Sequence, residues 1–377
     1  MKIGIDVFSF DKPGENYGVG PGVYVWHLLP KIFDQGKEHF FYVFANKDNK
    51  HMIPEAKNVK IIVSKLPNKF RPVRIIHEQV NIPYYTRKFL LDKIHFLGNN
   101  ISFLVAKKSI ITIYDLMWKY YFDRGKRSLK FYYTSLTIPK TISKAAGIIT
   151  ISKFIADEIG DTFQRRINVF PVLLAPGKLS DLSLDDEKKF QKKHPYNFIF
   201  TTTTSMPHKN LITVLKAIKE IKLRKKLDFK LIVAGQMKGS FHLSNQKFIS
   251  ENNLEDDILL LGFISEEEKS FLYRKAKFVI YPSIYEGFGL PILEAMSVGT
   301  PVISSKSASM PEVGGKACMY FDPNSVQELV KLFVDILQKK QDLSKFSELG
   351  LDQYNKFSWT KVADQTIAVY ETVNSRI

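Results

Sequence analysis

The sequence predicts an α/β protein of two doubly wound domains, each with a parallel sheet covered by helices. Short β-branched and aromatic runs alternate with segments of helical spacing along the chain, which is the pattern of parallel sheets. The chain has 377 residues, long for one domain and enough for two that each bury a core. A charged segment with Pro176 and Gly177 interrupts the alternation. We therefore expect domains at 1–175 and 195–358, joined by a linker at 176–194.

The first half contains six strand patterns. They lie at 2–8, 40–45, 59–63, 110–113, 147–150 and 168–174, and the last of them ends this half. A glycine-rich loop follows the first strand, and helical spacing begins at Val23. Ser152 is expected to cap the helix that follows 147–150. Between 65 and 93 the chain has seven Lys or Arg residues, two acids and three prolines.

The second half repeats the alternation. Strands are expected at 197–203, 229–234, 258–261, 278–281 and 302–305. Asn210 is expected to cap a helix whose apolar residues begin at Leu211. Capping boxes are expected at Ser265 with Glu268 and at Ser325 with Glu328. The last helix is expected at about 359–372.

Composition limits the class of protein. Hydrophobic residues make up 45% of the chain and charged residues 25%, as in ordinary globular domains. The single cysteine, Cys318, rules out an intramolecular disulfide and indicates a reducing compartment. The chain begins in a strand pattern, and no apolar run approaches the roughly 18 residues of a membrane span. These features predict a cytoplasmic protein that is soluble or peripheral to a membrane.

The net charge of +17 predicts an anionic partner or surface. Nucleic acid, anionic lipid and nucleotide sugars all qualify, and a lysine-rich genome composition is the alternative explanation. Seven aromatic and five basic residues interleave at 118–133. This stretch fits a surface for a lipid-linked or anionic glycan, or equally a helix pair with an aromatic core and solvated lysines.

The stretch 281–301 predicts a strand, a glycine-rich loop and a helix in immediate succession. Pro282 ends the strand, Gly287 and Gly289 surround Phe288, and Pro291 stands near the first helical position. Unpaired amides and the positive end of the helix dipole point out of such a turn, which suits a phosphate.

Two carboxylates and a lysine complete this candidate site. Glu286 and Glu294 bracket the loop and are suited to accept hydrogen bonds from sugar or ribose hydroxyls. Lys209 stands at a strand-loop-helix junction, where an ammonium can pair with a diphosphate. The alternative is that Glu294 complements a helix dipole while Glu286 and Lys209 are solvated. Amides that can hold phosphates lie beside carboxylates that can hold sugar hydroxyls, and this combination favours a nucleotide-sugar site.

The string E-G-F-G-L-P-x-L-E-A-M-x-x-G-x-P-V, residues 286–302, resembles the signature of family four glycosyltransferases. These are retaining enzymes of the GT-B fold, and the resemblance implies two Rossmann-like domains facing across a cleft. It also implies an acceptor-binding first domain, a nucleotide-sugar-binding second domain and a helix at 359–377 that packs back on the first. His77-Glu78-Gln79 and Pro311-Glu312 with Gly314 resemble further family elements.

The resemblance implies a role for each matching residue. Glu286 should contact donor-sugar hydroxyls, Glu294 the ribose, and Lys209 the leaving diphosphate. The loop residues Gly287, Phe288, Gly289 and Leu290 should hold sugar and phosphate through their amides. Tyr17-Gly18-Val19-Gly20 resembles the N-terminal glycine loop, so Gly18 and Gly20 are expected beside the donor phosphates. Thr203 and its neighbouring threonines occupy the donor loop where family members often carry an arginine.

Tyr114 departs from the family pattern. The family usually has His-Asp-Leu where this chain has Tyr114-Asp115-Leu116, and Asp115 matches. A phenol with a pKa of about 10 cannot act as a base at neutral pH, although it can hydrogen-bond a sugar hydroxyl. We expect Tyr114 and Asp115 in the catalytic site with Glu286 and Lys209. By resemblance, the leaving phosphate takes the acceptor proton.

No metal or other cofactor is expected, since the chain has no Asp-x-Asp, His-Glu-x-x-His or paired-cysteine pattern. The sequence predicts a hexosyltransferase that uses a GDP- or UDP-sugar and a glycan or lipid-linked glycan acceptor. By analogy it acts in bacterial surface polysaccharide or lipopolysaccharide synthesis, at the inner face of the cytoplasmic membrane.

Three alternatives remain. A dinucleotide-dependent oxidoreductase or sugar epimerase would need Gly-x-Gly-x-x-Gly after the first strand, which Gly18, Gly20 and Gly22 do not form. The second alternative is a basic protein that binds membranes or nucleic acid, but it does not explain the string of residues from Glu286 to Glu294. No nucleic acid partner is expected. An inactive family member is the third alternative, because of Tyr114.

Overall fold

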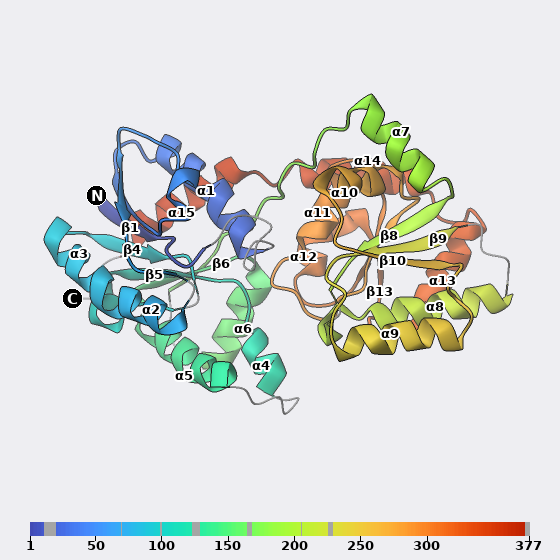
Figure 1. The fold of residues 1–377 in the computed structure, drawn as a ribbon, viewed down its shortest axis with the longest axis horizontal. Helices are drawn as coiled ribbons and strands as arrows, with labels where there is room; N and C mark the ends of the chain where they lie inside the picture. Colours follow the sequence, from blue (N-terminus) through green and yellow to red (C-terminus); the bar gives the residue numbers. More distant parts are fainter. Residues whose placement is uncertain are drawn as a thin grey trace. The chain divides into compact units, whose positions relative to one another are not determined.

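The computed structural model describes residues 1–10, 20–68, 70–98, 100–122, 129–163, 168–204, 206–224 and 229–373. The chain divides into unit 1, Met1–Ala175 with Ser358–Ile377, and unit 2, Pro176–Phe357. Each unit has one parallel sheet with helices around it (Figure 1). The prediction of two Rossmann-like domains is confirmed.

Unit 1 has a seven-stranded sheet of order β3-β2-β1-β4-β5-β6-β7, in which every pair is parallel. The strands are β1 (Lys2–Asp6), β2 (Phe40–Ala45), β3 (Val59–Val63), β4 (Lys93–Phe96), β5 (Ser109–Ile113), β6 (Gly147–Thr150) and β7 (Val169–Pro171). The chain order reverses between β1 and β4. In open parallel sheets, ligands bind outside the carboxyl ends of the strands at such a reversal.

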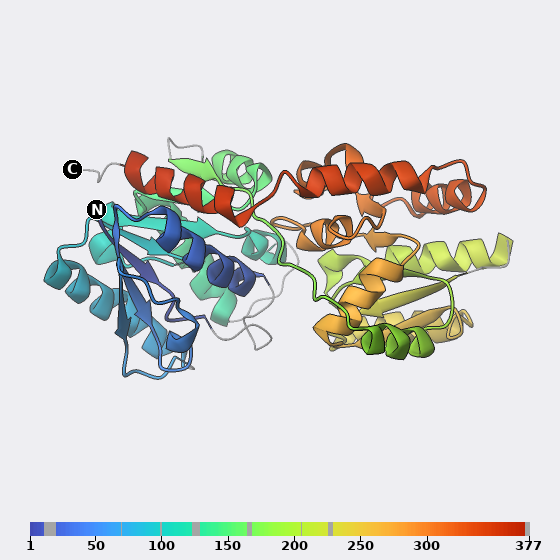
Figure 2. The same ribbon diagram turned by 90° about the horizontal axis from the view of Figure 1, so that it is seen from above.

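The last helix, α15 (Trp359–Thr372), belongs to unit 1 and lies along α1 (Pro21–Gln35), as the red and dark blue helices of Figure 2 show. The Trp359 ring stacks on His27 with 5.2 Å between ring centroids. The Tyr370 hydroxyl lies 2.7 Å from Nδ1 of His95, which is buried on β4. The remaining helices of this unit are α2 (Arg71–Ile76), η2 (His77–Asn81), α3 (Ile82–Phe89), α4 (Met117–Phe122), α5 (Leu129–Lys144) and α6 (Lys153–Phe163), with short 3-10 turns η1 (Lys50–Met52) and η3 (Phe103–Lys108).

Unit 2 repeats the plan with six parallel strands in the order β10-β9-β8-β11-β12-β13. They are β8 (Phe198–Thr202), β9 (Lys230–Ala234), β10 (Ile258–Gly262), β11 (Val279–Tyr281), β12 (Val302–Ser305) and β13 (Cys318–Phe321). The order reverses between β8 and β11. The loops that leave the carboxyl ends of these two strands are therefore the expected ligand site of this unit.

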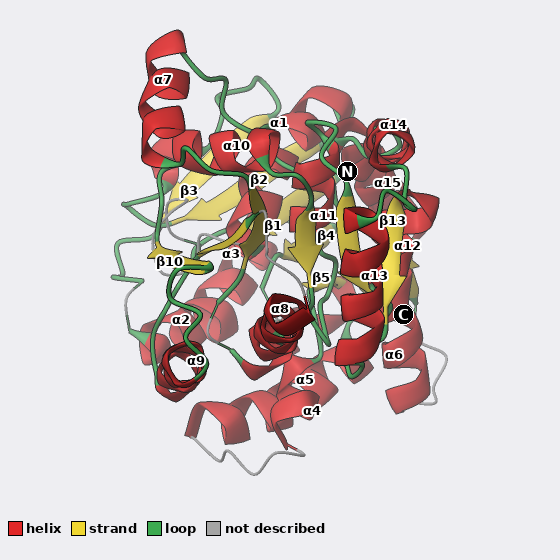
Figure 3. Ribbon diagram, turned by 90° about the vertical axis from the view of Figure 1, so that its right-hand side faces the viewer, coloured by secondary structure: helices red, strands yellow, loops and turns green. Residues whose placement is uncertain are grey.

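Helices enclose the second sheet, as the red ribbons around yellow strands in Figure 3 show. They are α7 (Leu184–Lys193), α8 (Leu211–Arg224), α9 (Ser240–Glu251), α10 (Glu266–Lys275), α11 (Leu290–Met296), α12 (Met310–Gly314), α13 (Val326–Leu337) and α14 (Leu343–Tyr354), with 3-10 turns η4 (Pro207–Lys209) and η5 (Gly315–Ala317). Buried side chains of α8, β9 and α13, among them Leu215, Val233 and Phe333, form the core between sheet and helices. No helix of the described residues is long and apolar enough to cross a membrane.

The predicted linker at 176–194 is partly wrong, because α7 occupies half of it. Ser183 and Asp186 cap this helix reciprocally, its first turn is acidic, and its last turn contains Lys192 and Lys193. This charge order complements the helix dipole, so the charged residues that suggested a linker stabilise a helix. The segment belongs to unit 2.

The two predicted capping boxes are half right. Ser265 and Ser325 each accept a hydrogen bond from the amide three residues on. The Glu268 carboxylate turns instead to His194, 2.8 Å away, and that of Glu328 accepts from the Asp322 amide. Strands β4 and β13 and helix α14 were not predicted, whereas the bounds of β2, β3, β6 and β12 are as predicted.

Candidate functional site

Lys209 and Glu286 meet where the strand order of unit 2 reverses. Lys209 ends the turn after β8, and Glu286 lies in the loop after β11. The Lys209 ammonium is 2.7 Å from the Glu286 carboxylate, and the side chains are 20% and 15% exposed. The two loops therefore present a half-buried ion pair that a solute can still reach.

The contact between Lys209 and Glu286 affects the pKa values of Glu286 itself and of Tyr281. Burial opposes the ionisation of Glu286, but the Lys209 ammonium and hydrogen bonds outweigh it and lower the pKa of Glu286 below its ordinary value. Burial and the neighbouring Glu286 carboxylate raise the pKa of Tyr281 well above its ordinary value. The centroid of the Tyr281 ring lies 6.0 Å from the Lys209 ammonium. Glu286 is thus a carboxylate at neutral pH, and Tyr281 is a neutral phenol.

Asn210 fixes the position of Lys209. Its backbone is left-handed, with φ of 54°, and its side chain is buried. The side-chain amide donates to the carbonyls of Pro282, 3.2 Å away, and Pro323, 2.8 Å away. The Ile284 amide also donates to the carbonyl of His208 at 2.7 Å. The β8 loop is therefore tied to the β11 loop through Asn210, a role that the sequence did not predict.

Three serines at the end of β12 and just after it hold the glycine loop. Ser305 donates to the carbonyl of Ser283 at 2.5 Å, and Ser307 to that of Ile284 at 2.6 Å. Ser309 donates to the carbonyls of Glu286 at 2.9 Å and Phe288 at 2.7 Å. These bonds engage four carbonyls of the loop. The alternating serines of S-S-K-S-A-S were a usable sequence signal, because small donors at every second position can follow a neighbouring loop.

The loop amides are left as donors. Within the described part of the chain, the amides of Gly287, Phe288 and Gly289 donate to no other residue. Gly289 has φ of 110°, a backbone that side-chain-bearing residues rarely adopt, and it precedes α11. The Phe288 side chain is 3% exposed and contacts Phe357, so this residue offers a ligand only its backbone. Leu290 is the first residue of α11.

Glu294 is held in one orientation on α11. The Tyr273 hydroxyl donates to its carboxylate at 2.8 Å, and the Lys269 ammonium lies 3.6 Å from its other oxygen. The Glu294 side chain is 19% exposed. Burial opposes the charge on Lys269, but Glu294 and Glu266 outweigh it and raise the pKa of Lys269. The sequence analysis did not identify Tyr273 or Lys269, because both lie on α10, outside the motif.

Tyr114 and Thr203 are not placed as the sequence predicted. The Tyr114 side chain is 7% exposed and its hydroxyl donates to the carbonyl of Leu97 at 2.7 Å, so its proton is committed inside unit 1. Burial raises the pKa of Tyr114 well above its ordinary value. The Thr203 side chain is 6% exposed, and its hydroxyl donates to the carbonyl of Thr204. Neither hydroxyl is available to donate to a sugar as placed here.

The remaining predicted residues lie in unit 1. Asp115 accepts a hydrogen bond from the Met117 amide at 2.9 Å, as in a turn that starts α4. Gly20 immediately precedes α1, and Gly18 lies outside the described residues. Much of the aromatic and basic stretch at 118–133 also lies outside them.

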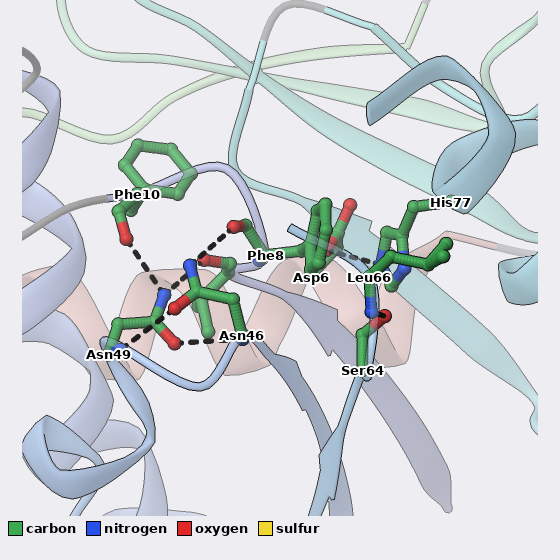
Figure 4. A network of polar contacts seen from close by, with 9 residues as sticks. Asp6, Phe8, Phe10, Asn46, Asn49, Ser64, Leu66 and His77 are labelled. Carbon is green, nitrogen blue, oxygen red and sulfur yellow. Dashed lines mark hydrogen bonds and ion pairs between the residues drawn. The ribbon is translucent and has the colours of Figure 1, made fainter. Parts of the chain in front are cut away.

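A polar cluster that the sequence analysis did not predict lies at the carboxyl end of β1 (Figure 4). Asp6 and His77 are buried, and the His77 Nε2 lies 3.3 Å from the Asp6 carboxylate. The His77 ring stacks on Phe8 with centroids 4.0 Å apart. Burial, and after it the Asp6 charge, raise the pKa of the next residue, Glu78, to about 8. Acidic groups thus gather where the strand order of unit 1 reverses.

Residues able to hold a metal occur at the opposite edge of this sheet. Glu38, His39 and Glu371 could each offer one ligand atom, and these atoms lie within 4.8 Å of one another. A pocket of about 670 Å³ at the same edge is lined by Lys2, Lys37, Lys57 and Asp92, among others. Because ligands of open parallel sheets bind at the carboxyl edge, we assign no ligand to either feature.

Residues 184–352 match the family model of the group 1 glycosyl transferases. The match covers 169 of the 377 residues of the chain. It runs from α7 into α14 and contains Lys209, Glu286 and Glu294. The candidate donor site therefore lies wholly within the glycosyl transferase segment.

Two curated proteins that the chain resembles are mannosyltransferases. O-antigen chain mannosyltransferase B of Escherichia coli is 36% identical over 168 residues, 45% of this chain and 44% of that protein. O-antigen chain mannosyltransferase RfbU of Salmonella typhimurium is 27% identical over 243 residues, 64% of this chain and 65% of that protein. The chain thus spans about half to two thirds of the length of these relatives.

Solved structures resemble the whole chain in fold. Sucrose-phosphate synthase from Thermosynechococcus elongatus aligns with a TM-score of 0.74 at 18% identity, covering 98% of both chains. Anabaena Alr3699/HepE, solved in complex with UDP, aligns with a TM-score of 0.72 at 15% identity, covering 98% of this chain and 99% of that one. The predicted GT-B type of fold is confirmed.

Proposed function

We propose that this protein is a retaining, metal-independent hexosyltransferase that uses a nucleoside diphosphate sugar. The observation that carries the proposal is the ion pair of Lys209 and Glu286 beside the Gly287–Gly289 amides, at the strand reversal of unit 2. A cation and free amides can bind a diphosphate, while carboxylates can bind hydroxyls. A nucleotide sugar has both groups in one molecule.

The donor that we propose to test first is GDP-mannose. Both relatives named above are mannosyltransferases, and the UDP complex of HepE makes UDP-sugars the second choice. In this proposal Glu294 binds the ribose and Glu286 the sugar hydroxyls. The orientation that Tyr273 imposes on Glu294 suits a diol, because a fixed carboxylate can accept from two adjacent hydroxyls.

The chemistry proposed for the site needs no side-chain base. Lys209 and the loop amides stabilise the negative charge that develops on the diphosphate as the glycosidic bond breaks. The acceptor hydroxyl attacks from the same face, and its proton passes to the leaving phosphate oxygen. The committed hydroxyl of Tyr114 is compatible with this route.

For the acceptor, we propose a glycan or lipid-linked glycan of a surface polysaccharide, bound by unit 1. The Asp6, His77 and Glu78 cluster lies where ligands of such a sheet bind. A protonated Glu78 could donate to a sugar oxygen, and Asp6 could accept from a hydroxyl. We place this reaction at the cytoplasmic face of the membrane.

The decisive experiment is a thermal-shift screen of the protein with GDP, UDP, ADP, dTDP, CMP and NAD, followed by donor hydrolysis with the matching sugar. A ligand at about 100 times its Kd adds roughly 2.7 kcal/mol, which is readily measured. A selective shift with one nucleoside diphosphate and slow release of that diphosphate from its sugar are expected. A shift with NAD alone would overturn the proposal, and binding without turnover would favour the inactive alternative.

A further inference from the structure

One helical run of unit 1 has an unusually apolar surface. The segments α2, η2 and α3 follow each other without a break from Arg71 to Phe89. Its exposed large hydrophobic side chains, with those at its two ends, are Phe70 (64%), Ile76 (49%), Val80 (58%), Tyr84 (57%) and Leu90 (72%). We call this surface the 70–90 face.

The run has a second, buried side, so the exposed residues do not reflect a loosely attached helix. His77, Ile82, Pro83 and Thr86 are buried. Pro83 lacks the amide that would bond to Gln79, and the chain adopts the wider π turn of η2 just before it. The backbone thus stays helical, with one side against unit 1 and the 70–90 face toward solvent.

The charges of this run are almost all positive. Arg71, Arg87 and Lys88 are exposed, and the Lys88 ammonium lies 5.6 Å from the centroid of the exposed Tyr84 ring. The only carboxylate between 70 and 90 is Glu78. Burial raises its pKa to about 8, so it is mostly uncharged at neutral pH. The apolar residues are therefore bordered by cations with no compensating negative charge on the run.

This combination favours one partner. Two copies of the face would bring like charges together, which opposes self-association. An anionic bilayer instead offers phosphates to the cations and an acyl boundary to the apolar side chains. We propose that the 70–90 face binds the surface of anionic membranes, with Ile76, Val80 and Tyr84 entering the headgroup region. This inference goes beyond the proposed function and does not depend on the donor.

The first test uses the single cysteine of the chain. Cys318 is 5% exposed, so a thiol-reactive, polarity-sensitive dye should label an introduced cysteine selectively. Val80→Cys reports on the face, and Leu243→Cys, 65% exposed on α9, is the matched control. With vesicles of phosphatidylcholine containing one third phosphatidylglycerol, the dye at 80 should shift to the blue and the dye at 243 should not. Equal shifts at both positions, or none at 80, would overturn the proposal.

The second test measures binding by vesicle flotation. The pair Val80→Ser and Tyr84→Ser should lower binding to anionic vesicles about tenfold, and Arg87→Gln with Lys88→Gln should lower it several-fold at low salt. Leu243→Ser should leave binding unchanged. Equal binding to pure phosphatidylcholine, or a dimer in light scattering that the Ser variants abolish, would overturn the membrane assignment.

These outcomes are separable from the proposed activity. The face variants should show unchanged thermal shifts with the donor nucleotide, because the substituted residues lie in unit 1 and none of them is a candidate donor-binding residue. If the wild-type protein bound no donor nucleotide, the proposed function would be refuted, and the conclusions from vesicle binding would be unaffected. Unchanged vesicle binding in the face variants would refute only the membrane proposal.

Discussion

The Lys209 ammonium lies 2.7 Å from the Glu286 carboxylate, although 76 residues separate the two in the sequence. Each follows one of the strands that flank the reversal of the second sheet, β8 and β11. Without a donor, each residue neutralises the other. A diphosphate would compete with Glu286 for Lys209, so its affinity should depend on the charge of the Glu286 side chain.

The pair should respond asymmetrically to substitution. Lys209→Met should weaken nucleoside diphosphate binding at least tenfold and lower kcat about 100-fold, because a carboxylate then faces the phosphates without its cation. Glu286→Gln should leave diphosphate binding equal or a few-fold tighter while lowering kcat about 100-fold. Calorimetric titration and steady-state kinetics check both.

Lys216→Met is the control for this pair, since Lys216 is an exposed lysine on α8. It should change neither binding nor turnover. If Glu286→Gln weakened diphosphate binding as much as Lys209→Met, Glu286 would contact the nucleotide and the assigned roles would be wrong.

Tyr273→Phe tests whether Glu294 must be oriented. The change removes the hydroxyl that donates to Glu294 at 2.8 Å and lies 3.1 Å from the Thr202 hydroxyl. We expect the KM for the donor to rise several-fold with kcat nearly unchanged, and stability to fall by about 1 kcal/mol. Tyr196→Phe, which loses a contact of 3.2 Å to His194, is the control and should leave KM unchanged. Equal effects on KM would argue against a ribose contact by Glu294.

Glu78 should make stability fall as pH rises. Its pKa is raised from 4.5 to about 8 in the folded protein, first by burial and then by Asp6. Above about pH 4.5 the folded state therefore keeps a proton that the unfolded chain releases. The free energy of unfolding falls as the pH rises from there to about 8, where Glu78 also loses its proton in the folded state. Between these values the loss is at most about 1.4 kcal/mol per pH unit. Urea unfolding of the wild type and of Glu78→Gln from pH 5 to 9 measures it, because the variant cannot ionise there; parallel profiles would contradict the prediction.

Asn210 should be critical to the stability of unit 2. Asn210→Ala leaves the carbonyls of Pro282 and Pro323 without their donor and puts alanine, which tolerates left-handed backbone less well than asparagine, at φ of 54°. We expect a loss of about 2–4 kcal/mol in the free energy of unfolding. Asn210→Gly loses the same bonds without the left-handed strain and should be about 1 kcal/mol more stable than the alanine variant. Denaturant unfolding gives both values, and equal stabilities would mean that the backbone relaxes at this position.

The elements that sequence reasoning found share a local signal. Strands β2, β3, β6 and β12 each contain a run of apolar, mostly β-branched or aromatic residues, and Ser265 and Ser325 are typical caps. The segment with α7 was taken for a linker because its outer residues are charged and Phe190 is its one buried side chain. Strand β4, with the sequence KIHF, was missed because His95 and Lys93 suggest polarity, yet both are buried, His95 between Tyr370 and Thr112.

The α/β class follows from the sequence alone, as do the two repeats of strand and helix and the motif with Glu286, Gly289 and Glu294, because these depend on local propensity, spacing and turn chemistry. Three contacts emerge only in the folded chain: Glu286 pairs with Lys209, Tyr273 fixes Glu294, and Tyr114 donates its proton to a backbone carbonyl. Such contacts join residues far apart in the chain. They depend on which strands lie side by side, and no local pattern encodes that order.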